Sequence, residues 1–360
     1  VGTEPVAAFI ICAGFILSHI AWNIPWVANV ALIPVLANNP DEAALLSSRR
    51  ATYTALGGII FSYAGAPLAE YLGKVTGSEV LGYAFLAGVM ALAMMICYWT
   101  IFKITDGYEV VEKDAEDSSK SQKTSGGVML KSLYQNPPLI VLLIADFFRY
   151  MVNFVMTASA AYYFTYVVKN MALLPMYLLL GSIVQTVGAY AAGPMAKKLS
   201  TRNATIISLF GLAASAIVGK FVAMNVMMFF VFVLIVRLFL GILTSTMVGL
   251  YSDTSVYAQW KTGEDATSFV MGLMTVSLKV AVISRGTVIP AVLAAVGFIP
   301  GADPVTATLA VQTAVINVFL FIPGIFALIS GLLMALGYRL TREKVSQLQN
   351  EINQRKAEAL

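Results

Sequence analysis

The sequence has little charge, two cysteines and a single histidine among its 360 residues. Charged residues make up 12% of the chain and hydrophobic residues 59%, a balance that excludes both a soluble globular domain and a disordered chain. Cys12 and Cys97 lie in apolar runs and are too few for a disulfide framework or a cysteine zinc site. The net charge of +4 is modest and its basic residues are scattered, so nothing indicates nucleic-acid binding.

Enzyme signatures are also missing. The sequence contains no HExxH zinc helix, no GxSxG nucleophile elbow and no P-loop, the glycine-rich loop that holds nucleotide phosphates. We therefore expect no enzymatic activity, no metal site and no resident cofactor. Without a nucleotide site, any active transport by this chain must draw on an ion gradient.

Long apolar runs dominate what is present. A transmembrane helix needs about 20 mainly apolar residues, and nine runs approach or exceed that length. They are too long for strands and lack the alternation of a membrane β-barrel, so the sequence predicts an all-α integral membrane protein. The runs cover residues 6–36, 51–72, 82–102, 139–168, 174–195, 205–222, 227–250, 268–298 and 306–338.

Positive charge is unevenly distributed between the runs. Most of the 23 Lys and Arg residues lie in the segments after the first, third, fifth and seventh runs and in the C-terminal tail. Cytoplasmic loops of membrane proteins are enriched in Lys and Arg, so we expect these segments and the C-terminus in the cytoplasm. The chain starts at Val1 without an initiator Met or a signal peptide, from which we expect that upstream spans are missing.

A hydrophilic segment divides the runs into two groups. Residues 104–135 have mixed charge with Ser and Gly, as in a flexible cytoplasmic linker. Three runs precede it within residues 1–103 and six follow within residues 136–340. Because six-span halves are common among transporters built from repeats, we expect the remainder of an N-terminal bundle and a complete C-terminal bundle. These would be nine of twelve spans, followed by a cytoplasmic tail over residues 341–360.

Two stretches are expected at surfaces. The tail places Val345, Leu348 and Ile352 on one face of a polar helix. That helix is too short to argue a coiled coil, so we expect it to be solvated or to lie on the membrane surface. The aromatic segment YYFTY at residues 162–166 ends the fourth run, where a belt of Tyr and Trp at the membrane interface is common.

Several charged side chains interrupt the runs. A Lys or Arg at the centre of a span costs about 2.5–3.5 kcal/mol on insertion scales, so such residues are functional candidates by default. Lys279 lies deep in the eighth run and shares a helix face with Thr275. Arg237 has no acid in its own run, whereas Asp146 and Arg149 lie three residues apart and can form a structural ion pair.

A second polar patch lies in the first run, which reads HIAWNIPW over residues 19–26. His19 and Asn23 lie one turn apart, and Pro25 removes a helical hydrogen bond. His19 is a candidate proton carrier because imidazole groups titrate near neutral pH. The alternative is a structural kink with a satisfied Asn23 and an interfacial Trp26.

A specific pattern runs through residues 253–298. It consists of DT at 253–254, Tyr257, WKTG at 260–263, Thr275, Lys279 and GF at 297–298. This pattern resembles the glycoside-pentoside-hexuronide:cation symporters, a melibiose permease-like branch of the major facilitator superfamily. Weaker matches extend the resemblance over essentially the whole chain, as family helices four to twelve: IPW at 24–26, Arg50, YYFTYV at 162–167 and YRL at 338–340.

The resemblance implies a major facilitator fold of two helical bundles that alternate in access around a central sugar site. It implies substrate contacts at His19, Asn23, Trp26, Arg50, Thr275 and Lys279. It also implies a cytoplasmic gate that contains Asp253, Tyr257, Trp260 and Lys261. The family's cation-binding acids lie on its second helix, upstream of Val1, so this sequence shows no site for the Na⁺ or H⁺ that we expect to be co-transported.

The charge balance within the runs leads to a further hypothesis. Among the charges that we place away from the membrane surfaces, only Asp146 is acidic and five are basic: Arg50, Arg149, Arg237, Lys279 and Arg285. We hypothesise an anionic glycoside, such as a hexuronide or a sulfated sugar, with Arg149, Arg237 and Arg285 as possible anion contacts. The alternative is that acids on the missing helices pair with these residues.

Three functions therefore remain open. The favoured one is a secondary transporter in the plasma membrane, the inner membrane in bacteria, that carries a glycoside together with a cation. Its partners would be this small molecule and the lipid bilayer. The second is a carrier of an amphipathic, lipid-like anion on the same fold, and the third is a non-transporting membrane partner or sensor.

Overall fold

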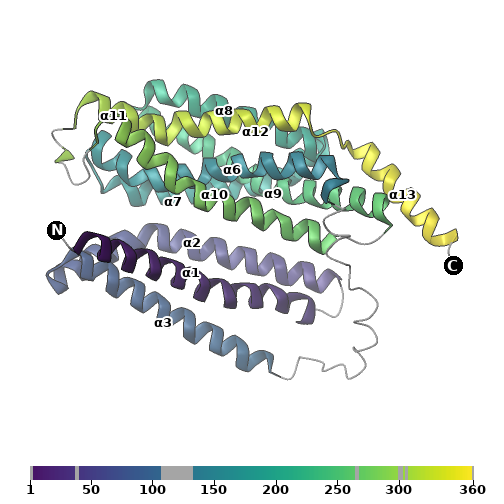
Figure 1. The fold of residues 1–360 in the computed structure, drawn as a ribbon, viewed down its shortest axis with the longest axis horizontal. Coiled ribbons are helices and arrows are strands. Elements are labelled where there is room, and N and C mark those ends of the chain that lie inside the picture. Colours follow the sequence, from purple (N-terminus) through teal and green to yellow (C-terminus); the bar gives the residue numbers. More distant parts are fainter. Residues whose placement is uncertain are drawn as a thin grey trace. The chain divides into compact units, whose positions relative to one another are not determined.

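A computed structural model describes residues 3–36, 40–106, 133–263, 267–298, 303–304 and 307–358. The regular structure in these residues is entirely helical, which confirms the predicted all-α class (Figure 1). The chain divides into two compact units, unit 1 (Val1–Lys123) and unit 2 (Thr124–Leu360). Most of the predicted linker, residues 107–132, lies outside the described residues.

Unit 1 consists of three long helices, α1 (Thr3–Leu36), α2 (Pro40–Thr76) and α3 (Glu79–Thr105). α2 and α3 form a hairpin whose turn contains Gly77 at a φ of +72°, a left-handed conformation that favours glycine. A Cβ atom on Gly82 of α3 would lie 2.5 Å from the Ala69 carbonyl oxygen of α2. The two helices therefore approach closely because glycine stands at their contact.

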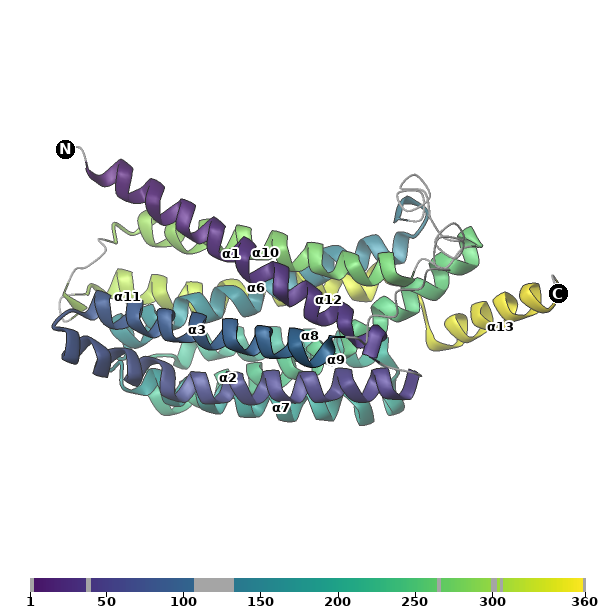
Figure 2. The ribbon, with the colours of Figure 1, turned by 90° about the horizontal axis from the view of Figure 1, so that it is seen from below.

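Unit 2 is a bundle of six apolar spans followed by a polar helix. α6 packs against α10 and α12, whereas α9 packs against α7 and α8. Figure 2 shows α13 extending from the end of the bundle at which α12 finishes. The elements are α6 (Pro137–Tyr162), the π-helical turn η2 (Tyr163–Val167), α7 (Leu173–Leu199), α8 (Thr201–Val222), α9 (Val226–Thr262), α10 (Thr267–Ala295), α11 (Leu309–Ile316), the π-helical turn η4 (Asn317–Phe321), α12 (Ile322–Leu336) and α13 (Arg342–Glu358).

Two glycines set the crossing of α7 and α9. A Cβ atom on Gly188 of α7 would overlap the Leu238 carbonyl oxygen, and a Cβ atom on Gly241 of α9 would overlap the Gln185 carbonyl oxygen. Backbone therefore lies directly against backbone at this crossing. Small residues allow such contacts between transmembrane helices, where close packing replaces the hydrophobic effect as the driving force.

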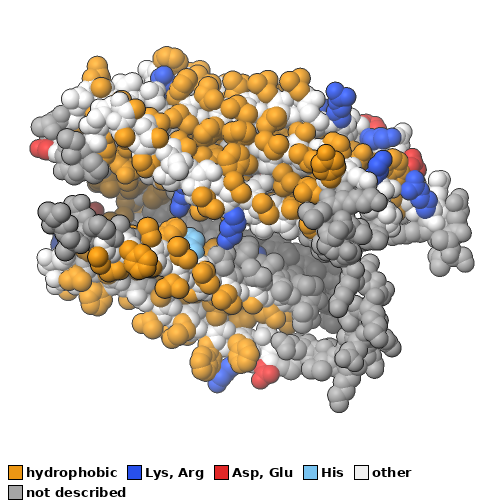
Figure 3. Space-filling model, viewed as in Figure 1, with side chains coloured by type: hydrophobic (Ala, Val, Ile, Leu, Met, Phe, Trp, Pro, Cys, Tyr) orange, Lys and Arg blue, Asp and Glu red, His pale blue; other side chains and the backbone are white. Residues whose placement is uncertain are grey.

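The outer surface of both units is apolar. Among the described residues, seven helices are long and apolar enough to cross a membrane, and helices overlap all nine predicted runs. Large side chains such as Phe9, Phe102 and Phe221 are exposed, and Figure 3 shows apolar side chains along the helices of each unit. This surface suits contact with lipid, as expected for an integral membrane protein.

α9 is longer than the seventh apolar run. Residues 251–262, which follow the apolar run, continue the helix for three further turns. The helix ends at Gly263, whose φ of +78° allows a left-handed cap, and the Gly263 N–H donates to the Gln259 carbonyl oxygen at 2.9 Å. The gate residues Asp253, Tyr257 and Trp260 therefore lie on a helix and not in a loop.

The aromatic segment after α6 is buried, so its assignment to an interfacial belt was wrong. Tyr163 and Phe164 are 0% exposed, and Tyr166 is 9% exposed. The Tyr163 ring stacks on Phe229 at 4.1 Å between centroids, and its hydroxyl donates to the Ala223 carbonyl oxygen at 2.6 Å. This segment is part of the core because rings from other helices cover it, which local sequence does not reveal.

The tail helix α13 docks on the protein, which corrects the expectation of a solvated or membrane-surface helix. Leu348 is 0% exposed and Ile352 is 5% exposed, because the apolar face of α13 packs against α9. Thr341 caps the helix by accepting the Lys344 N–H at 3.3 Å. Hydrogen bonds from the Glu343 backbone and the Thr341 side chain lower the pKa of Glu343.

Candidate functional site

The candidate site residues of unit 1 lie on α1 and α2. Arg50 of α2 donates its Nε to the Asn29 amide oxygen of α1 at 3.1 Å. His19 of α1 has its Nδ1 3.2 Å from the Phe15 carbonyl oxygen and its ring 4.1 Å from the Phe15 ring. The side chains of Asn23 and Trp26 lie outside the described part of the structure, although α1 includes both positions.

Asp146 and Arg149 of α6 form an ion pair inside unit 2, as predicted from their spacing. The Arg149 Nε lies 2.6 Å from the Asp146 Oδ1. Arg149 is 5% exposed and Asp146 is 0% exposed. The Tyr251 hydroxyl of α9 donates to the other carboxylate oxygen at 3.1 Å. Arg149 also lies 3.9 Å from the centre of the Tyr150 ring. The carboxylate therefore compensates this guanidinium at short range.

Arg237 of α9 has a different environment. It is 6% exposed, donates from Nη2 to the Tyr177 hydroxyl of α7 at 2.5 Å and from Nη1 to the Asn153 amide oxygen of α6 at 3.3 Å. Its Nε is buried without a hydrogen-bond partner. Both partners are neutral, so Arg237 keeps a net positive charge in the bundle.

The predicted contacts of α10 lie at the surface of unit 2. Thr275 and Lys279 are exposed, and the Thr275 hydroxyl donates to the Gly272 carbonyl oxygen at 2.7 Å. Arg285, six positions after Lys279, places its guanidinium 5.5 Å from the centre of the Phe154 ring of α6. The structure thus brings Arg285 next to α6, one residue from Asn153, the amide that contacts Arg237.

The predicted gate residues occupy the end of α9 and contact α13. The Trp260 Nε1 donates to the Glu351 carboxylate at 2.6 Å, and the Trp260 carbonyl oxygen accepts from Arg355 at 3.1 Å. The Tyr257 and Trp260 rings lie 5.8 Å apart, and the Lys261 ammonium lies 5.7 Å from the Trp260 ring. α13 therefore contacts the end of α9 through both the indole ring and the backbone of Trp260.

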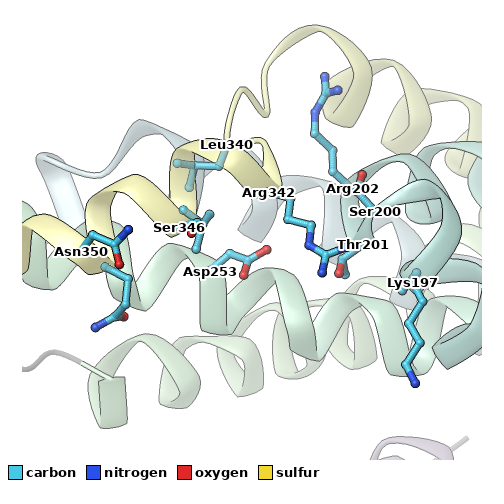
Figure 4. Close-up of a pocket in the computed structure, with 12 residues that line it drawn as sticks. Lys197, Ser200, Thr201, Arg202, Asp253, Leu340, Arg342, Ser346 and Asn350 are labelled. Carbon is cyan, nitrogen blue, oxygen red and sulfur yellow. The ribbon is translucent and has the colours of Figure 1, made fainter.

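Asp253, the remaining gate residue, is half-buried and lines an open pocket in unit 2. Figure 4 shows Asp253 on α9 and Arg342 at the start of α13 near each other in this pocket, whereas the Arg202 side chain points away from them. Arg202 also donates to the Tyr338 and Ala335 carbonyl oxygens at 2.7 and 3.0 Å, which caps the end of α12. The pocket therefore lies between the α7–α8 turn, α9 and α13.

Three polar partners were not predicted. Asn153 lies four residues after Arg149, so helix spacing alone could have placed both on one face of α6. Tyr177 and Tyr251 lie in or next to apolar stretches, and no local signal distinguishes them from other aromatic side chains of a span. Their roles depend on partners in other helices.

Known proteins resemble this chain over most of its length. A family model described as MFS/sugar transport protein matches residues 2–342. The isoprimeverose transporter of Lactiplantibacillus pentosus is 26% identical over 304 residues, which cover 83% of this chain and 60% of that transporter. A putative sulfoquinovose importer of Escherichia coli (strain K12) is 25% identical over 358 residues, 98% of this chain and 73% of the importer.

A third relative, the glucuronide carrier protein homolog of Escherichia coli (strain K12), is 23% identical over 359 residues, 99% of this chain and 74% of the carrier. The chain therefore spans 60% to 74% of the length of these three relatives. The matches confirm the resemblance that the sequence pattern predicted, and they point to transporters and not to enzymes. Because the family model matches nearly all its residues, the chain belongs to the MFS/sugar transport family, and its helices form a partial major facilitator fold.

Proposed function

We propose that this chain belongs to a secondary active transporter that carries a sugar or glycoside together with a cation by alternating access. The observation that carries this proposal is the sugar-transport family match over residues 2–342. The relatives support it, because their names specify isoprimeverose, sulfoquinovose and glucuronide as substrates. The proposed mechanism is the rocking of two helical bundles around a site near the middle of the membrane.

The proposed substrate contacts are His19, Asn23, Trp26 and Arg50 in unit 1 and Thr275 and Lys279 in unit 2. Guanidinium, ammonium, amide and hydroxyl groups on apolar helices need hydrogen-bond partners, and a polyol supplies many acceptors and donors at once. For Arg50, the structure places the guanidinium Nε against the Asn29 amide oxygen of α1, and a guanidinium suits the recognition of several oxygens at once.

The membrane setting and gate are part of the same proposal. We place the protein in the plasma membrane, the inner membrane in bacteria, with α13 in the cytoplasm on the basis of its Lys and Arg content and that of the preceding loops. Asp253, Tyr257, Trp260 and Lys261 would then belong to a cytoplasmic gate. The contact of Trp260 with Glu351 supports a coupling of this gate to α13.

The coupling cation is proposed as co-transported substrate, either Na⁺ or H⁺. Sugar symport needs a gradient-driven partner because the sequence contains no nucleotide site. A lipid-like anion as substrate and a non-transporting role are not favoured, because the relatives are named as carriers of sugars and sugar acids.

Uptake into membrane vesicles tests the proposal. Vesicles containing the full-length protein are given isoprimeverose, p-nitrophenyl β-D-glucoside or p-nitrophenyl β-D-glucuronide under an imposed Na⁺ gradient, an imposed H⁺ gradient or neither. We expect accumulation of at least one glycoside that depends on one gradient, and exchange of preloaded glycoside without a gradient. Vesicles that show neither accumulation nor exchange for isoprimeverose and both glycosides would overturn the proposal.

A further inference from the structure

Arg237 carries a buried charge without a carboxylate. Among the described residues no Asp or Glu oxygen lies within 4.0 Å of its guanidinium, whereas Arg149 on α6 has Asp146 at 2.6 Å. Arginine remains protonated in proteins, and charged residues within membrane spans mark substrate or ion pathways. The charge of Arg237 would be stabilised by a negatively charged partner, and no described side chain of unit 2 supplies one.

The groups around Arg237 offer hydrogen-bond donors to such a partner. Its Nε–H is buried and has no acceptor among the residues that the structure describes. The Tyr177 oxygen accepts from Nη2, which leaves the Tyr177 hydroxyl hydrogen for another acceptor. Asn153 accepts through its amide oxygen, so its amide nitrogen keeps two donors. Tyr177 is 0% exposed, and Asn153 is partly exposed, so the cluster reaches from the core to the edge of the bundle.

Gly181 lies directly beside the Arg237 Nε. It lies on α7, one turn after Tyr177, and a Cβ atom there would stand 3.4 Å from the Arg237 Nε and 3.5 Å from its Cγ. That is an ordinary contact distance, so alanine fits without strain but covers the nitrogen. Gly181 is therefore the position at which an added methyl group would contact the Arg237 Nε directly.

We propose that Arg237, Tyr177 and Asn153 bind the oxyanion of a glycoside that carries one carboxylate or sulfonate group. Two or more oxygens of such a group can accept from the guanidinium and the phenol together, a geometry that suits the planar donor set of arginine. This inference rests on the proposed function and names the substrate class and the anion contacts for it. Arg149 is not the main contact, because Asp146 already compensates it.

Paired substrates and matched variants test the inference. Uptake of p-nitrophenyl β-D-glucuronide is compared with uptake of p-nitrophenyl β-D-glucoside, which differs only in carrying a hydroxymethyl group in place of the carboxylate. The variants are Arg237→Gln, Gly181→Ala, which keeps the charge but covers the Nε, and the control Lys220→Gln. Lys220 is a cation in α8 that lies 4.1 Å from the Phe321 ring and has no role in the proposed site.

We expect Arg237→Gln to raise the KM for the glucuronide by on the order of 10- to 100-fold, as for the loss of a charge-assisted hydrogen bond. The KM for the glucoside should change less than about twofold. Gly181→Ala should also raise the KM for the glucuronide, but by a smaller factor. Lys220→Gln should leave the KM for both substrates unchanged. An equal effect of Arg237→Gln on both substrates, or unchanged glucuronide uptake in Gly181→Ala, would overturn the inference.

A binding measurement separates this inference from the proposed function. Methyl β-D-glucuronide should raise the melting temperature of the purified wild-type protein but not that of Arg237→Gln, and methyl β-D-glucoside should not show this difference. If the shift is found without any transport, the proposed function fails and the anion site stands. If neutral glycosides alone are bound and transported, the anion site fails and the proposed function stands.

Discussion

Asp146 and Arg149 neutralise each other within one turn of α6, with the Arg149 Nε 2.6 Å from the Asp146 Oδ1. Tyr251 donates to the second carboxylate oxygen from α9, and both ends of the pair are buried. The pair therefore joins two central helices of unit 2. It also removes one arginine from the set of uncompensated charges.

Replacing Asp146 by Asn should destabilise unit 2. The variant leaves the Arg149 charge buried without its carboxylate, which for buried pairs costs about 3–5 kcal/mol. The double variant Asp146→Asn/Arg149→Gln should lose less than the sum of the two single variants, because it removes both charges. The measurement is thermal unfolding of the purified protein in detergent, and strictly additive losses would contradict the ion pair.

Replacing Arg237 by Met should reduce the stability of unit 2 much less than replacing Asp146 by Asn. The change removes a buried charge whose hydrogen-bond partners are the neutral Tyr177 and Asn153. Each lost hydrogen bond to the charged group is worth about 1.5–3 kcal/mol net, and relief of the desolvation cost of the buried charge offsets this loss. The same unfolding assay should therefore place this variant close to the wild type or above it. A loss as large as that of Asp146→Asn would show that Arg237 has a structural counter-ion.

Gly241→Ala should disrupt the α7–α9 crossing. Its Cβ atom would overlap the Gln185 carbonyl oxygen of α7, so the helices must separate, and overpacking of this kind costs about 1–3 kcal/mol or more. Gly193→Ala is the matched control in α7, since a Cβ atom there meets nothing within 4 Å. Size-exclusion profiles after heating should show early loss of the folded peak for Gly241→Ala only.

Leu348→Asp should detach α13 from α9. Leu348 is 0% exposed, and a carboxylate in its place would be buried without a partner. Trypsin should then cleave within α13 at least about tenfold faster than in the wild type, as expected when a docked helix opens locally. Gln347→Ala, a change at an exposed neighbour, should leave the cleavage rate unchanged, and equal rates in both variants would contradict the docking.

Lys279→Gln should weaken the transport of charged and neutral glycosides alike. The proposed role of Lys279 is hydrogen bonding to sugar hydroxyls, which both substrates carry, so KM should rise by about tenfold for each. Thr287→Ala, an exposed position two turns further along α10, is the control. A selective loss of glucuronide uptake in Lys279→Gln would assign the anion to Lys279 and not to Arg237.

Some features of the site were predictable because they are local. The pairing of Asp146 with Arg149 followed from a spacing of three residues on a helix, and the long apolar runs followed from composition. The burial of the aromatic segment 162–166 and of the tail helix was not predicted, because it depends on contacts with distant residues. Their environment is created by Phe229 and by the end of α9, which lie far away in the sequence.

The sequence by itself determined that the chain is an all-α membrane protein and a member of a sugar-transport family, because span length and the pattern over residues 253–298 are properties of contiguous residues. Helix packing is needed to tell which buried arginine has no carboxylate within ion-pair distance in the described part of the chain. Arg237 meets Tyr177 and Asn153, which are 60 and 84 residues away in the chain. The effect of a charge in a membrane span depends on the atoms within a few ångströms of it, and helix packing brings those atoms from distant parts of the sequence.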